Sequence, residues 1–139
     1  MNTRLKLDMF ICKHDVDYTE NTITEVELES LCSRFELNIG RELRAYLLKY
    51  GYLGYKHIEF FGINSVQRDM SDMIRKTLSF RKVFPNRKKL IAIKGGRDDD
   101  QLFVNEKDEV IRYVPYRNQF ICVKNSLFEY ILEVFENIQ

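Results

Sequence analysis

The sequence predicts an α+β fold in which helices cover an antiparallel sheet of short strands. Apolar residues recur at three- and four-residue intervals towards both ends of the chain, which is the spacing of amphipathic helices. Short apolar runs alternate with turn residues after position 90, as in strands joined by tight loops. The chain has 139 residues, of which 45% are hydrophobic, and this suits one core. We therefore expect a single domain over residues 1–139.

Two helices are expected in the N-terminal half. Thr24 and Glu27 have the spacing of a capping box and a helical apolar stripe follows them, so the first helix should run from about 25 to 35. A second stripe of the same period should end at Gly51, because glycine commonly closes helices. The next segment is rich in aromatic residues and glycine, which favours a loop and then a short strand around 58–61.

A third helix is expected in the middle of the chain. Asn64 or Ser65 can cap its N-terminus, and Pro85 should end it. Its apolar stripe would comprise Val66, Met70, Met73, Ile74 and Leu78. The arginines and lysines of this segment would then lie mainly on the other faces of the helix.

The C-terminal third should contain the sheet and a closing helix. Strands are expected at 90–93, 102–104, 110–114 and 120–123. The short turn between the second and third of these predicts an antiparallel hairpin, and Pro115 should stop further pairing of the third. Asn125 or Ser126 can cap the last helix, in which residues 127, 128, 131, 132 and 135 form one apolar face.

Charge is distributed unevenly along a chain whose net charge is only +1. Residues 64–97 contain ten lysines and arginines against two aspartates, whereas the segments on either side are net acidic. This pattern predicts either internal charge pairing or a surface that faces an acidic partner, and the sequence leaves both open. The candidate partner-binding residues are Arg68, Arg75, Lys76, Arg81, Lys82, Arg87 and Lys88.

No residue pattern supports catalysis, a cofactor or a metal ion, and we expect a protein that is not an enzyme. Cys12 and His14 lack the second ligand pair of a tetrahedral zinc site. Cys32 falls on the apolar face of the first helix, where core packing is expected. The aspartates at 98–100 lack the ligand spacing of a calcium loop, and they oppose phosphate binding by the preceding pair of glycines. The three cysteines match no disulfide or zinc pattern, so we expect reduced and mostly buried thiols.

Two further features bear on location and partner class. No apolar run approaches the roughly 20 residues that span a bilayer, and the N-terminus lacks the apolar stretch of a signal peptide, so we expect a cytoplasmic protein without a membrane partner. Tyr113, Tyr116 and Phe120 lie near Arg112 and Arg117 in sequence. These residues could form a stacking surface for single-stranded nucleic acid, but alternating burial in strands explains the aromatic residues equally well.

A longer pattern runs through about residues 24–137. An acidic first helix leads to a second from Arg41 to Gly51, then to Phe60-Phe61-Gly62-Ile63, the strand at 90–93, Gly95-Gly96-Arg97-Asp98, the later strands and the closing helix. In this order the features resemble the SUKH superfamily, which holds bacterial toxin-immunity proteins and fungal regulators of cell-wall glucan synthesis. The expected sheet covered by helices is therefore SUKH-like.

What the resemblance implies is a protein that binds a secreted or contact-delivered toxin, often a nuclease, and blocks it directly in the cytoplasm. The family offers no catalytic residues to transfer to this chain. One alternative is a regulatory scaffold or adaptor that binds an endogenous enzyme, as the fungal relatives do. Another, less favoured, is a nucleic-acid-binding module that uses residues 64–97. The sequence leaves the oligomeric state open.

Overall fold

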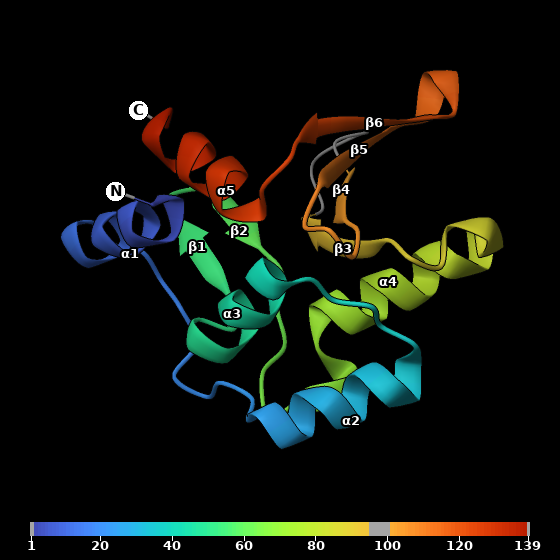
Figure 1. Cartoon of the computed structure of the whole chain (residues 1–139), viewed down its shortest axis with the longest axis horizontal. Coiled ribbons are helices and arrows are strands. Elements are labelled where there is room, and N and C mark those ends of the chain that lie inside the picture. The colour runs from blue at the N-terminus through green and yellow to red at the C-terminus, as the bar shows by residue number, and fades with distance from the viewer. Residues whose placement is uncertain (1, 95–100, 139) are drawn as a thin grey trace.

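A computed structural model describes residues 2–94 and 101–138. Its helices are α1 (Thr3–Lys13), α2 (Glu25–Phe35), α3 (Arg41–Lys49), α4 (Asp72–Val83) and α5 (Leu127–Glu136). Its strands are β1 (Leu53–Tyr55), β2 (Ile58–Phe60), β3 (Ile91–Lys94), β4 (Gln101–Val104), β5 (Val110–Val114) and β6 (Gln119–Lys124). Three single 3₁₀ turns are η1 (Arg68–Met70), η2 (Pro85–Arg87) and η3 (Pro115–Arg117). Helices and short antiparallel strands together confirm the predicted α+β class (Figure 1).

The larger sheet has the strand order β3-β4-β5-β6, and every neighbouring pair in it is antiparallel. The predicted hairpin is present, since Val104 lies opposite Val110 across a short turn. β1 and β2 form a separate two-stranded ribbon. Phe61, just after that ribbon, donates its backbone N–H to the carbonyl of Ile93 at 2.7 Å, so the β3 edge of the larger sheet is covered there.

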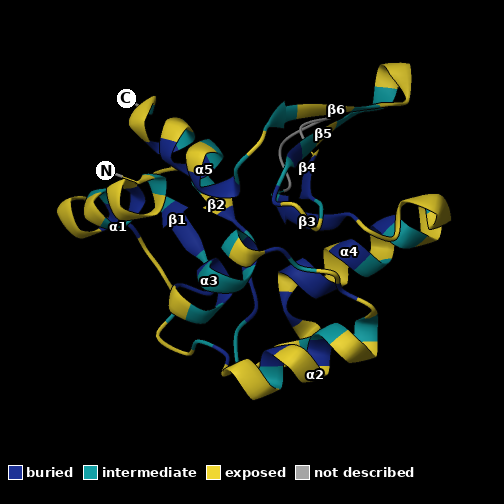
Figure 2. Ribbon diagram, viewed as in Figure 1, coloured by how far each residue is buried: buried dark blue, intermediate teal, exposed yellow. Residues whose placement is uncertain are grey.

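The two faces of this sheet pack against different helices. Leu102, Val104 and Val110 point into the main core, which they share with buried residues of α1, α3 and α5. Phe103 points to the opposite face and packs with Phe80 of α4 in a smaller cluster. Figure 1 shows α4 on one side of the sheet and α5 on the other, and Figure 2 shows their buried surfaces turned inward.

A buried tyrosine connects the main core to the two-stranded ribbon. Tyr46 of α3 is 2% exposed, and its hydroxyl donates to the carbonyl oxygens of Phe60 at 3.1 Å and Phe61 at 2.8 Å. Burial raises the pKa of this phenol, so the hydroxyl keeps its proton and remains a donor. The chain leaving β2 is thereby held against α3.

Several predicted elements are confirmed, and two predictions are wrong. α2 has the predicted capping box, α3 is followed by Gly51 at φ +68°, and α5 is capped by Ser126. The third helix, however, begins at Asp72, and the predicted core residues Val66 and Met70 are exposed. The physical reason is a local turn at 64–66, in which side-chain hydrogen bonds compete with a helix. Residues 53–55, expected as loop, form β1.

The sequence patterns did not predict α1. This helix buries only Leu7 and Ile11, so its apolar periodicity is weak. Its N-terminus is nevertheless capped, because the Asn2 Oδ1 accepts the backbone N–H of Leu5 at 2.8 Å. α1 packs along α5, and this tertiary contact compensates for the weak pattern.

Candidate partner-binding groove

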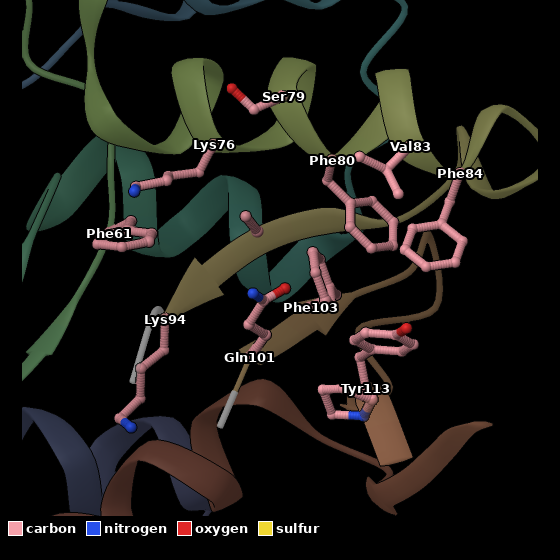
Figure 3. Close-up of a pocket in the computed structure, with 12 residues that line it drawn as sticks. Phe61, Lys76, Ser79, Phe80, Val83, Phe84, Lys94, Gln101, Phe103 and Tyr113 are labelled. Atoms are coloured by element: carbon pink, nitrogen blue, oxygen red, sulfur yellow. The ribbon is translucent and has the colours of Figure 1, made fainter. Parts of the chain in front are cut away.

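A groove lies between α4 and the facing side of the larger sheet. Its volume is about 790 Å³, and aromatic and aliphatic side chains form most of its wall. The described residues that line it are Phe61, Lys76, Ser79, Phe80, Val83, Phe84, Ala92, Lys94, Gln101, Phe103, Tyr113 and Pro115. Figure 3 shows that α4 supplies one wall, while β3, β4 and β5 supply the other. We call this feature the aromatic groove.

Five rings at one end of the aromatic groove contact one another. Phe80 of α4 lies 4.2 Å from Phe103 of β4 between ring centroids, and Phe84 lies 5.1 Å edge-on from Tyr113 of β5. Tyr113 in turn lies 4.9 Å from Phe120 of β6. Phe80 and Phe103 are buried, whereas the other three rings are only partly covered. The cluster therefore presents an apolar surface on a helix and strands, and the hydroxyl of Tyr113 is the one polar group on its rings.

Two different periodicities in the sequence explain why these rings lie together. Phe80 and Phe84 are four residues apart, so they project from the same side of α4 and its C-terminal cap. Tyr113 and Phe120 lie directly opposite each other in the β5–β6 pair, so their side chains share one face of the sheet. A helix and a hairpin thus supply partners to the same ring cluster.

Positive charge flanks this apolar surface. The guanidinium of Arg87 lies over the Phe120 ring, with 4.2 Å between Cζ and the ring centroid. Lys76 is exposed on the α4 wall, one turn before Phe80. Among the described lining residues, lysines are present and carboxylates are not. This combination suits a partner surface that carries both an apolar anchor and negative charge.

The candidate basic residues of the sequence do not form one surface. Arg68 pairs with Glu27 of α2 at 2.6 Å, and Arg75 pairs with Asp72 one turn away on α4. Lys76 and Arg87 lie at the aromatic groove, whereas Lys82 and Lys88 are exposed elsewhere on α4 and after η2. Some of these cations thus pair within the protein, whereas Lys76 and Arg87 lie beside the aromatic groove.

Arg81 has a structural role that the sequence did not indicate. Its guanidinium donates to the carbonyl oxygens of Phe35 at 2.6 Å, Glu36 at 2.9 Å and Lys88 at 2.7 Å. Burial lowers the pKa of this guanidinium, although Glu36 opposes that effect. Arg81 therefore joins the end of α2 to the segment after α4, and its charge is directed into the protein.

The candidates considered for chemistry do not come together. Cys12 is exposed, and the His14 ring stacks on Phe10 with 3.9 Å between centroids. Cys32 packs against the core as predicted, and burial raises the pKa of its thiol. The expectation of mostly buried thiols is wrong, because Cys122 is also exposed. The aspartates at 98–100 and their preceding glycines lie outside the described residues, and no cluster of metal-binding side chains occurs among the residues that are described.

The helical half of the groove was not predicted from the sequence. Of the aromatic residues named from the sequence, Tyr113 and Phe120 do lie together, and Tyr116 is 88% exposed on the η3 turn. Phe80 and Phe84 lie beyond Leu78, the last residue of the predicted apolar stripe, and so were not among the expected residues. The four-residue spacing of these two phenylalanines was the available signal.

Comparisons with known proteins agree with the observed architecture. A family model described as "SUKH_5: SMI1-KNR4 cell-wall" matches residues 11–136, which is most of the chain. No curated protein matches the sequence. Among the described residues, no helix is both long enough and apolar enough to cross a membrane.

Proposed function

Because the chain belongs to the SUKH family of SMI1-KNR4 cell-wall proteins, we propose that it is an immunity protein, which neutralises a toxin in the cytoplasm by stoichiometric binding and without catalysis. The observation that carries this proposal is the aromatic groove, an exposed apolar surface on rigid elements with lysine and arginine beside it. Aromatic residues and arginine are the side chains most enriched at the energetic centres of protein interfaces.

The proposed mechanism is occlusion of a site that the toxin needs. An apolar side chain of the toxin would pack onto the partly exposed rings of Phe84 and Tyr113, which already contact each other and are therefore held in place. Carboxylates around that anchor would face Lys76 and Arg87. Because the rings are held in place before binding, little side-chain entropy is lost when the partner docks. An interface of standard size, about 800 Å² on each partner, would extend well beyond the groove.

We expect the Val83→Asp variant to lose protection against a toxin encoded beside this gene. Val83 lines the groove but is 69% exposed, so the substitution places a carboxylate at the proposed interface with little effect on folding. Affinity should fall tenfold or more, a typical loss at the centre of an interface. The measurements are survival of cells that co-express the toxin domain and titration of the purified pair by calorimetry.

Val66→Asp provides the matched control. Val66 is 75% exposed and lies before η1, outside the groove, so this variant should protect like the native protein and bind with a stoichiometry near one. Equal loss of binding in both variants would remove the groove from the proposal. Protection at strongly substoichiometric ratios would contradict a binding mechanism and indicate catalysis.

A regulatory adaptor is the second candidate, and the family description as cell-wall proteins favours it. Such a protein would bind an endogenous enzyme, and toxin co-expression would then show no protection. Nucleic-acid binding through residues 64–97 has less support, because Arg68, Arg75 and Arg81 are engaged within the protein. It would require an affinity that falls steeply with salt as counterions are released from phosphate.

A further inference from the structure

The strand β6 lies at the open edge of the larger sheet. β5 pairs with one side of it, and no strand pairs with its other side in the described part of the chain. In such a strand, the backbone N–H and C=O groups of every second residue point outward from the edge of the sheet, where they can pair with another strand. Figure 1 shows β5 and β6 extending beyond the helical layers, with β6 outermost.

The composition of β6 lacks the features that usually protect an exposed edge. Natural edge strands commonly carry lysine, other charges or proline. In β6, the five consecutive residues 119–123 are uncharged and contain no proline, although 31% of the whole chain is charged. Lys124 is the one charge on the strand, and it pairs with Glu133 of α5 at 2.5 Å. Ile121 is 42% exposed at the middle of the uncharged stretch.

We propose that β6 pairs antiparallel with β6 of a second copy, about a two-fold axis at Ile121. A two-fold axis perpendicular to the sheet leaves the same face of both copies on the same side of the combined sheet. Each residue of β6 must therefore pair with a residue of the second β6 whose side chain points to that same face. Pairing Ile121 with its own copy meets this condition and places Phe120 opposite Cys122. The register shift of the β5–β6 pair lies at the Lys124 end, so residues 119–122 keep a regular register.

Charge favours a second copy as the occupant. Residues 119–123 of one β6 would lie opposite residues 119–123 of the other, and none of these side chains is ionised. Lys124 would lie opposite Asn118. No like charges therefore face each other across the pair, which would otherwise destabilise it. The product is a continuous eight-stranded sheet in which the aromatic grooves of both copies open on the same side. Two partner molecules could then bind side by side.

The first test is the mass of the purified full chain, measured by size-exclusion chromatography with light scattering over a range of concentrations. We expect a dimer at high concentration, and a monomer for Ile121→Lys because it opposes two ammonium groups at the two-fold axis. Val26→Lys is the control, since Val26 is 80% exposed on α2, which lies outside the sheet and away from β6 (Figure 1). It should dimerise like the native chain.

The second test reports the geometry of the pair. In a Cys122→Ser background, Ile121→Cys should form an intermolecular disulfide on mild oxidation, because opposed residues lie about 4.5–5.5 Å apart between Cα atoms, within the range of disulfides. Exposed Cys12 serves as the internal control for random collision. A native chain that stays monomeric at every concentration, or disulfides that form through Cys12 as readily as through position 121, would overturn the proposal.

Discussion

Two carboxylates cap helices that are distant from them in sequence. Gly40 precedes α3 and has no side chain to cap it, so Asp108 accepts the backbone N–H groups of Glu42 and Leu43, each at 3.0 Å. A Cβ at Gly40 would lie 2.4 Å from the Asp108 carboxylate, which explains the glycine. Glu42 in turn accepts from the Ser126 hydroxyl at 2.8 Å, at the start of α5. Single side chains thus connect three elements.

Asp108→Ala should lower the free energy of unfolding by about 2–3 kcal/mol. Asp108 is 7% exposed, so its removal leaves the buried N–H of Leu43 and the partly buried N–H of Glu42 without their acceptor. Asp108→Asn should cost less, because the amide oxygen can accept and asparagine tolerates the φ of +61° at this position. Urea denaturation of both variants measures the difference. A loss below about 0.5 kcal/mol for the alanine variant would show that water replaces the carboxylate.

At the scale of elements, local signals determined which predictions were correct. α2 and α5 carry both an amphipathic stripe and a side-chain cap, and the structure places them where the sequence did. α1 and the start of α4 differ from prediction because tertiary contacts and the 64–66 turn outweigh local periodicity. The groove could be predicted only in part. The groove residues that lie on strands can be predicted from the alternation of side chains between the two faces of a strand. The approach of α4 to the sheet depends on long-range packing that no local pattern encodes.

The α2 capping box should make stability depend on pH. The Thr24 backbone and hydroxyl donate to the Glu27 carboxylate at 3.2 and 3.0 Å, and with Arg68 they lower its pKa below the ordinary 4.5. A lowered folded pKa means that the stabilisation is present above pH 4.5 and is lost as pH falls through the folded value. Glu27→Gln keeps an acceptor but removes the charge, so its urea midpoint should lie below that of the native chain at neutral pH.

The same comparison in acid provides the control for this pH dependence. Once the pH is below the lowered pKa of Glu27 in the folded chain, both chains carry an uncharged side chain at position 27, and their midpoints should converge. A constant difference between the two chains across pH would show that the charge of Glu27 has no part in stabilising α2.

At the scale of the molecule, the uneven charge of the sequence becomes a set of contacts between layers. Arg68 and Glu27 pair across the gap between η1 and α2, and Arg34 of α2 pairs with Asp69 at 3.1 Å. The arginine of each pair is largely exposed, so solvent screens both pairs and weakens their contribution to stability. Among the ion pairs of the described residues, only the Arg68–Glu27 pair joins a cation of the basic centre to an acid of the N-terminal segment, which is the internal pairing that one of the two sequence hypotheses predicted.

Arg81 and Lys82 are neighbours in sequence, but substitution of Arg81 should destabilise the protein far more than substitution of Lys82. Arg81 donates to three carbonyls from two distant segments, so Arg81→Ala should cost about 2–3 kcal/mol of unfolding free energy by leaving these acceptors unpaired. Lys82 is exposed on α4, and Lys82→Ala should change stability by less than about 0.5 kcal/mol. Thermal and urea unfolding of both variants measure this. Equal stability of the Arg81→Ala and Lys82→Ala variants would show that Arg81 does not join α2 to the segment after α4. In that case alone, weaker binding by the Arg81→Ala variant would indicate a partner surface at Arg81.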